Sequence, residues 1–298
     1  MAYSRATLVQ RIRYLLQDTP AADNITGAYT AAGLTLTVND ATLYDKGDLL
    51  EFKADGDTFL VNSAAGTTVT MLAAGLSWDG STNADHASGA AFFLRPAFRY
   101  LAILEAIEDT ILELWPWAWK VTTDTVTPVS GTRWYDAATS TTTAMDIIDA
   151  TQRDTAASPS QGVVRYGGRR NPYTISLERS LPTAVAASTV GYHIPMVHNT
   201  TYTIAVRVRA RLLTTFTTPN YVDLVEGSMV EAVIYGAASR LLENTEVPRV
   251  TQQDVTQGDA SVRPQARIRS AAYFRGLYFK ARERARRELN TISPPMGV

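Results

Sequence analysis

The chain contains no cysteine among its 298 residues. A disulfide framework and a thiolate zinc site are therefore both excluded, which fits assembly in a reducing cytoplasm. No apolar run approaches the about 18 residues that a membrane-spanning helix needs. The first residues also lack the continuous apolar segment of a secretory signal. We therefore expect a soluble protein that has no membrane partner.

Signatures of catalysis are also missing. The three histidines (His86, His193 and His198) are not spaced as ligands on one helix face, and the sequence has no HExxH, Walker lysine loop, G-x-S-x-G or G-x-G-x-x-G pattern. No nucleophile and base can be paired, so we predict that the protein is not an enzyme and uses no cofactor. Acids are frequent over residues 40–57, but they lack the EF-hand pattern, and we interpret them as solvated carboxylates rather than a calcium site. They are Asp40, Asp45, Asp48, Glu51, Asp55 and Asp57.

Apolar residues at helical spacing predict a central helix that begins near Pro96 and ends before Pro116. Its stripe comprises Tyr100, Leu104, Ile107, Ile111 and Leu114. A short helix over 4–18 is predicted at the N-terminus, with Leu8 and Ile12 on its apolar face and Arg5, Arg11 and Arg13 facing outward. Two more helices are predicted over 228–242 and 266–290. Each of these helices has an apolar stripe that needs a packing partner.

Between the helices the sequence alternates with a period of two residues, which is typical of β-strands. The segments 34–40, 48–54, 57–64 and 67–73 predict four strands, and Asp55-Gly56 marks a hairpin between two of them. A last strand is expected near 90–94. A second β-rich region is predicted over 119–217. In its last strand Ile204, Val206 and Val208 face one way, and the other face carries Arg207, Arg209 and Arg211.

We therefore predict an α+β protein in which N-terminal, central and C-terminal helices form one bundle, with two inserted β modules of the small barrel or sandwich type. The predicted domain organisation is 1–24 with 95–118 as the first part of the bundle, 25–94 as a small β module and 119–217 as a second β domain. It continues with 218–244 as a bundle helix, 245–265 as a linker and 266–298 as a basic helix and tail.

The last helix carries the strongest charge pattern. Nine lysines and arginines but only two acids follow residue 260, a net charge of +7, so residues 1–260 carry −8 of the total of −1. Three interpretations remain open: a solvated face with i,i+4 ion pairs, contact with an acidic protein surface, or contact with DNA. The residues of this helix that we expect to bind a partner are Arg275, Tyr278, Phe279, Lys280, Arg282, Arg284, Arg286 and Arg287. Arg169 and Arg170, after a glycine pair, are a further candidate for loop contact.

Several motifs resemble those of tailed-bacteriophage structural proteins. The first β module resembles a small virion module that opens "TVxDAT…GD" and closes "HAAGA". Here the matching residues are 37–38, 40–42, 47–48 and 86–90, with Ser88 and Asn62 departing from the pattern. The predicted helices outside this module resemble those of head-to-tail adaptor (connector or neck) proteins. The matches are an N-terminal helix over 8–19, an "EAVxYGAAxxLL" helix over 231–242 and the basic last helix. Residues 119–217 match no motif.

The resemblance implies a structural virion protein at the neck of the particle, assembled in the host cytoplasm. It implies a ring, commonly of twelve copies, that docks beneath the portal protein, contacts the next neck or tail protein and lets DNA pass without sequence specificity. Two alternatives stay open. One is a tail or surface protein whose β modules bind carbohydrate through Trp78, Trp134 and Tyr135. The other is a DNA-binding protein that uses its basic last helix.

Overall fold

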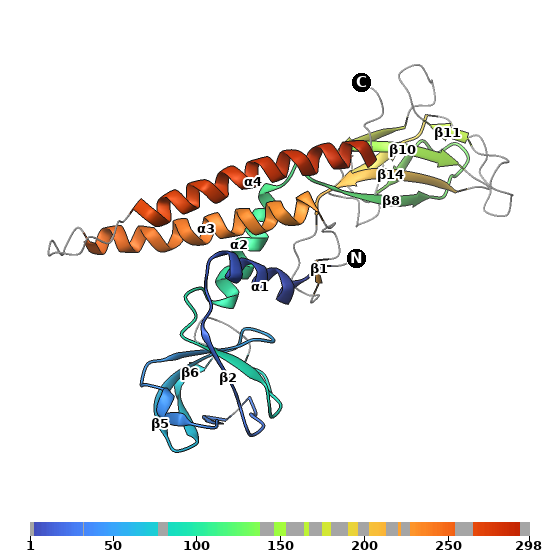
Figure 1. Ribbon diagram of the computed structural model, residues 1–298. Helices are drawn as coiled ribbons and strands as arrows, with labels where there is room; N and C mark the ends of the chain where they lie inside the picture. The colour runs from blue at the N-terminus through green and yellow to red at the C-terminus, as the bar shows by residue number, and fades with distance from the viewer. Residues whose placement is uncertain are drawn as a thin grey trace. The chain divides into compact units, whose positions relative to one another are not determined.

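The computed structural model describes residues 3–31, 33–76, 83–137, 146–152, 164–166, 175–179, 190–195, 203–212, 220–221, 227–253 and 265–292 (Figure 1). The chain forms two compact units, each assembled from separated segments. Unit 1 comprises Met1–Ile111, Thr214–Glu226 and Val230–Lys280, and unit 2 comprises Leu112–Leu213, Gly227–Met229 and Ala281–Val298. The predicted mixture of helices and antiparallel β structure is confirmed, with four α-helices in the described part of the chain.

Unit 1 contains a six-stranded antiparallel sheet in the order β2-β7-β4-β5-β6-β3 (Figure 1). The strands are β2 (Ala21–Asn24), β3 (Thr35–Thr37), β4 (Leu49–Phe52), β5 (Thr58–Ala65), β6 (Thr68–Leu76) and β7 (Ala91–Leu94), with a 3-10 turn η1 (Ala41–Leu43) before β4. The turn predicted at Asp55-Gly56 joins β4 to β5. A second turn at Ala65-Gly66 joins β5 to β6, and both glycines have positive φ. Strand β2 lies in a stretch that we had assigned to the helical part, so that boundary was wrong.

The two edges of this sheet meet. The N–H of Thr26, just after β2, donates to the carbonyl of Thr37 at the end of β3, at 2.7 Å. The core inside the curled sheet is aromatic, with Phe52, Phe59 and Phe92 fully buried. This inward face is what the alternating pattern of the sequence predicted.

The residues that carry the resemblance in this module stabilise its turns and strand pairing. Asp40 accepts the N–H of Thr42 and so caps η1. Gly47 has a φ of +91°, and the Asp48 carboxylate next to it accepts Arg95 Nη2 at 2.7 Å. The closing motif pairs with residues 25–29, since His86 exchanges two backbone hydrogen bonds with Tyr29 and the N–H of Gly89 donates to Ile25. These motif residues are therefore determinants of the module's fold.

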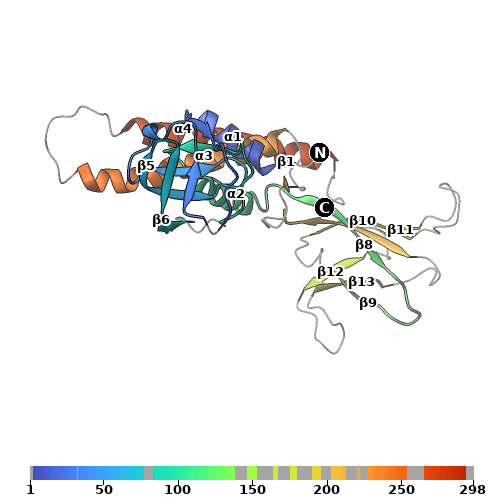
Figure 2. The ribbon, with the colours of Figure 1, turned by 90° about the horizontal axis from the view of Figure 1, so that it is seen from below.

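Unit 2 contains two antiparallel sheets (Figure 2). One has the order β11-β10-β14-β8 and the other β12-β13-β9. The strands are β8 (Lys120–Val126), β9 (Trp134–Asp136), β10 (Asp146–Gln152), β11 (Val164–Tyr166), β12 (Ser176–Arg179), β13 (Val190–His193) and β14 (Ile204–Ala210). Residues of both sheets form one core, which joins Val206 of β14 to Tyr192 of β13. The alternation predicted for β14 is confirmed, because Ile204, Val206 and Val208 are all fully buried.

The helices are α1 (Arg5–Leu15), α2 (Tyr100–Glu113), α3 (Ser228–Gln253) and α4 (Gln265–Ile292). Ser4 caps α1 by accepting the N–H of Thr7. Helix α3 continues to Gln253, so the prediction of a linker over 245–253 was wrong. None of the helices in the described ranges is long and apolar enough to cross a membrane.

A short strand pair joins distant parts of unit 1. Strand β1 (Tyr3–Ser4) pairs antiparallel with β15 (Asn220–Tyr221), with Tyr3 opposite Tyr221. Neither strand was predicted, because two residues are too few for an alternating pattern to be read.

Candidate functional site

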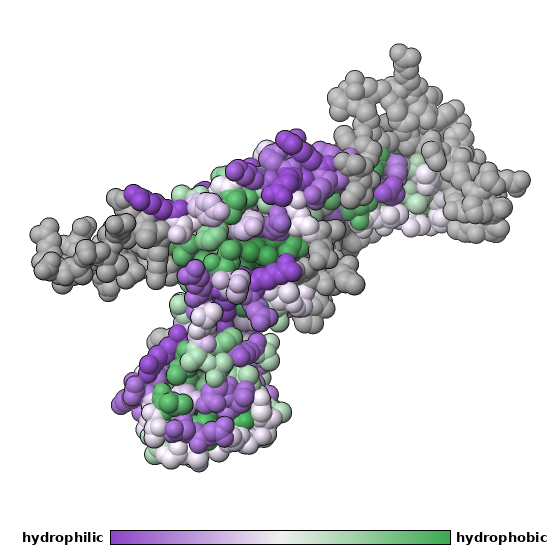
Figure 3. Space-filling view, in the orientation of Figure 1, coloured by the Kyte–Doolittle hydropathy of each residue, from purple (hydrophilic) through white to green (hydrophobic). Residues whose placement is uncertain are grey.

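The basic helix α4 lies antiparallel to α3 (Figures 1 and 2). The start of α3 contacts the end of α4, where Ser228 binds Glu288, and residues further along α3 contact earlier residues of α4. The ring of Phe274 is parallel to that of Tyr235, with ring centroids 6.5 Å apart, and Arg275 Nη1 lies 3.1 Å from the Glu243 carboxylate. On the face shown in Figure 3, hydrophilic residues gather along α4, above the more hydrophobic α3.

Within unit 2, two of the predicted partner-binding arginines contact a tryptophan. The guanidinium of Arg282 lies 4.3 Å and that of Arg286 5.0 Å from the ring centroid of Trp117. Such cation–π contacts are worth about 0.5–2 kcal/mol each. They hold the end of α4 against the segment that follows α2. At the same end of α4 the Ser228 hydroxyl donates to the Glu288 carboxylate at 2.6 Å.

The other predicted residues of α4 divide by exposure. Tyr278 is buried, with 3% of its surface exposed. Lys280, Arg284 and Arg287 are exposed, and Phe279 keeps 40% of its surface in solvent. The candidate interaction surface therefore narrows to Phe279, Lys280, Arg284 and Arg287, which we call the α4 surface. Arg169 and Arg170 lie outside the described residues.

Helices α2, α3 and α4 meet at Gly236 in unit 1. A Cβ placed on this glycine would lie 2.4 Å from Thr110 Cγ2 of α2 and 3.1 Å from Tyr278 Cδ2 of α4. Only a glycine lets the three backbones approach so closely. On α3, one turn later, Arg240 Nη1 lies 3.8 Å from the Asp109 carboxylate of α2. Helix α4 is therefore a packed element of the scaffold as well as a charged surface.

A buried charge cluster joins α1, the six-stranded sheet and the start of α2. Arg13 Nη2 donates to the Glu51 carboxylate and, at 2.9 Å, to the carbonyl of Phe98. Glu51 accepts the N–H of Tyr100 at 2.6 Å, and Asp18 accepts those of Ala97 and Phe98 at 3.0 and 3.2 Å. The carboxylates thus bind the amides that the start of a helix leaves free. The prediction that Arg13 faces outward was wrong, since it is 5% exposed.

The acids of residues 40–57 are in part buried. Asp48, Glu51 and Asp57 are exposed by 7% or less, so their interpretation as solvated carboxylates was wrong. Burial opposes ionisation of Asp48, but its hydrogen bonds from Arg95 and the Asp45 amide hold its pKa below the usual value. Charge periodicity alone does not separate such paired carboxylates from exposed ones.

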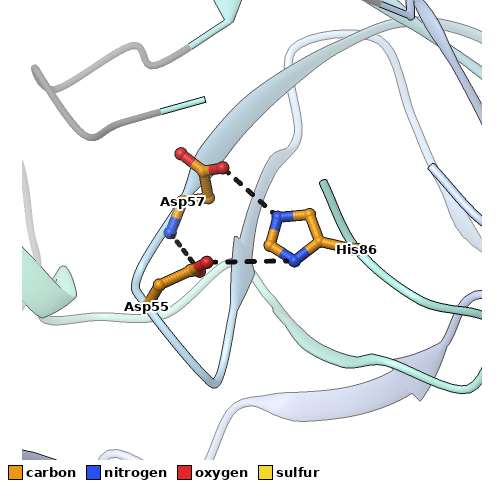
Figure 4. Close-up of side chains that lie close together, drawn as sticks. All are labelled: Asp55, Asp57 and His86. Atoms are coloured by element: carbon orange, nitrogen blue, oxygen red, sulfur yellow. Dashed lines mark hydrogen bonds and ion pairs between the residues drawn. The ribbon is translucent and has the colours of Figure 1, made fainter. Parts of the chain in front are cut away.

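Asp55, Asp57 and His86 carry ligand atoms of the kinds that bind metal ions (Figure 4). His86 Nε2 lies 3.2 Å from an Asp57 oxygen, while Nδ1 lies 3.9 Å from an Asp55 oxygen. The two carboxylates therefore face different nitrogens of the imidazole ring, whereas a single metal ion would bind only one of these nitrogens. The same Asp57 oxygen accepts the N–H of Ala84 at 2.6 Å.

The His86 ring also stacks on Phe52, with ring centroids 3.6 Å apart and an interplanar angle of 8°. This geometry fits a hydrogen-bonded contact that joins the segment before β7 to the β4–β5 turn better than it fits a metal centre.

The aromatic residues that motivated a carbohydrate site lie in different surroundings. Tyr135 is 9% exposed, and its hydroxyl donates to the Thr132 carbonyl at 2.9 Å. The Trp134 ring contacts His193, with centroids 4.4 Å apart. Trp78 lies outside the described residues. A buried, hydrogen-bonded Tyr135 offers no face for a sugar ring, so its part in that hypothesis was wrong.

Glu108 on α2 is half-buried, and we expect it to make stability depend on pH. Burial is the main reason that its pKa is raised from 4.5 to about 7. The positive charge of Arg5 lowers this pKa, and the negative charges of Asp109 and Glu105 raise it. Folding therefore favours the protonated form. That contribution is fully present below pH 4.5 and is lost as the pH rises through about 7.

The wild-type protein should lose free energy of unfolding between pH 5 and pH 8. We predict that this loss is smaller by about 1 kcal/mol in Glu108→Gln, a value that allows for solvent screening of the half-buried group. Denaturant unfolding at both pH values measures it. Glu113→Gln, an exposed change on the same helix, is the control, and an unchanged pH dependence in Glu108→Gln would contradict the prediction.

No family model matches the sequence, and no curated protein matches it.

Proposed function

We propose that this chain is a structural virion protein, a head-to-tail adaptor that forms a ring beneath the portal of a tailed phage. In this proposal α1 to α4 form one helical bundle, and the curled six-stranded sheet and the paired sheets of unit 2 are the two β modules inserted in it. The protein acts without catalysis and without a cofactor. DNA passes through the ring without sequence-specific contact.

The observation that carries the proposal is the close junction of α2, α3 and α4 at Gly236. Helix α2 is separated from α3 by more than a hundred residues of mostly β sequence, yet α2, α3 and α4 converge there, which fits a helical bundle of the adaptor type. The α4 surface supports docking, because it combines exposed cations with the 40% exposed ring of Phe279. Aromatic and basic side chains of this kind are enriched at protein interfaces.

The test is mass measurement of the full chain, alone and with the portal protein of the same particle. We expect a defined ring on the portal, even if the isolated chain is monomeric. The variant Lys280→Gln/Arg284→Gln/Arg287→Gln should weaken docking at least tenfold. The control Arg207→Gln on β14 removes a charge from a surface ion pair and should dock normally. A chain that stays monomeric with the portal would rule out the adaptor function.

DNA contact through the same helix is the competing function, and it predicts a different result. Duplex DNA would then bind with an affinity that falls steeply with salt, and the triple variant would lose that affinity while portal docking was unaffected.

A further inference from the structure

A pocket of about 440 Å³ lies between α1 and the six-stranded sheet of unit 1. Its walls come from α1, the turn after it, β2, β4 and β7, with the ring of Tyr100 from the start of α2. The volume falls in the range of about 300–1,000 Å³ that is usual for ligand pockets. The charge cluster of Arg13, Glu51 and Asp18 forms part of its lining.

Apolar and aromatic groups line most of the remaining pocket. Val9, Pro20 and Ala22 contribute aliphatic surface, and the ring of Phe93 lies between two cations. Arg13 Cζ and Lys53 Nζ are each 4.6 Å from the Phe93 ring centroid. Tyr14 belongs to the same lining and exposes 81% of its surface. Its ring is therefore accessible to a ligand that enters the pocket.

The charges of the pocket favour an anionic occupant. The Glu51 and Asp18 carboxylates are buried and bind Arg13 and backbone amides of residues 97–100. Lys53, in contrast, is exposed. Besides Arg13, helix α1 carries Arg5 and Arg11 outside the lining, and it has no acid. An approaching carboxylate therefore meets cations at the surface, while the acids of the lining are already neutralised.

We propose that this pocket binds an aromatic side chain flanked by carboxylates, presented by a segment of a partner protein. The aromatic ring would fill the apolar space beside Phe93, and a carboxylate would pair with the Lys53 ammonium. The inference rests on the pocket alone and does not depend on the adaptor function.

The probe is the peptide acetyl-Gly-Asp-Phe-Asp-Gly-amide, titrated into the isotope-labelled full chain and followed by amide chemical shifts. We expect saturable shifts at Tyr14, Thr19 and Lys53. Acetyl-Gly-Lys-Phe-Lys-Gly-amide should bind much more weakly because its charges are reversed. Acetyl-Gly-Asp-Ala-Asp-Gly-amide should leave the shifts unchanged because the anchoring ring is absent.

Lys53→Gln should weaken the Asp-Phe-Asp peptide about two- to fivefold, the range expected for one exposed ion pair. Lys46→Gln, an exposed lysine of the same module outside the pocket, is the matched control and should bind as the wild type does. Ala6→Phe, which adds a ring from α1 into the pocket, should abolish binding. Absence of shifts with a folded wild-type chain, equal binding of the Lys-Phe-Lys peptide, or preferential shifts with an oligothymidylate would overturn the proposal.

Discussion

Replacing Glu51 with alanine is expected to lower the free energy of unfolding by about 3–5 kcal/mol. The change leaves the Arg13 guanidinium, 5% exposed, without its main anion and the N–H of Tyr100 without its acceptor. An uncompensated buried charge is among the costliest defects a core can carry. Because the cluster joins α1, β4 and the start of α2, the loss should lower the stability of all of unit 1.

Guanidinium unfolding followed by circular dichroism measures the effect. Arg275→Ala is the control, since it removes one partner of an exposed ion pair, with side chains 55% and 42% exposed, and should cost less than about 1 kcal/mol. In Arg13→Ala/Glu51→Ala we expect a loss well below the sum of the single losses, as the two charges depend on each other. Additive single effects would show that the two side chains are not coupled.

The second large effect is expected at Gly236. Alanine normally stabilises a helix by about 1 kcal/mol over glycine, but here its Cβ would lie 2.4 Å from Thr110 Cγ2. Thr110 is fully buried and its hydroxyl donates to the Ala106 carbonyl, so it has little freedom to move. We therefore predict that Gly236→Ala destabilises the protein by about 1–3 kcal/mol through overpacking.

Helix α4 provides a matched control for that substitution. A Cβ on Gly276 would have no heavy atom within 4 Å, so Gly276→Ala should stabilise the protein by about 0.5–1 kcal/mol. Thr110→Ser removes the clashing methyl group and keeps the hydroxyl, and in combination with Gly236→Ala it should recover part of the loss. Thermal unfolding of the four proteins measures all of this. Stabilisation by Gly236→Ala equal to that of Gly276→Ala would mean that the helices do not meet closely.

The regular elements were predictable where their patterns were long. The strands β4, β5, β6 and β14 follow an alternation of at least four residues, and α2 and α4 follow a helical stripe, so local sequence was sufficient. Strands β1, β2 and β9 were missed because their formation depends on partners distant in the chain. Helix α3 was cut short because a proline outweighed the neighbouring helix formers in the prediction.

The candidate sites were less predictable, because burial of a charge is a tertiary property. On the helical stripe of α1, Arg13 follows the buried Ile12, but nothing nearby in sequence indicates that Glu51 will neutralise it. The charge pattern singled out the α4 arginines only as a group. Only the contacts with Trp117 separate Arg282 and Arg286 from their exposed neighbours. The pocket beneath α1 combines residues from 6 to 100, and no motif marks such a set.

The junction at Gly236 also constrains the order of events on the ribosome. Thr110 is synthesised about 125 residues before Gly236, which at about 5–20 residues per second is a delay of roughly 6–25 s. During that interval the apolar face of α2 has no α3 or α4 to cover it, while the strands of residues 120–210 are still being synthesised. Nascent chains that stop within this interval should expose that face, bind chaperones and aggregate when chaperones are scarce.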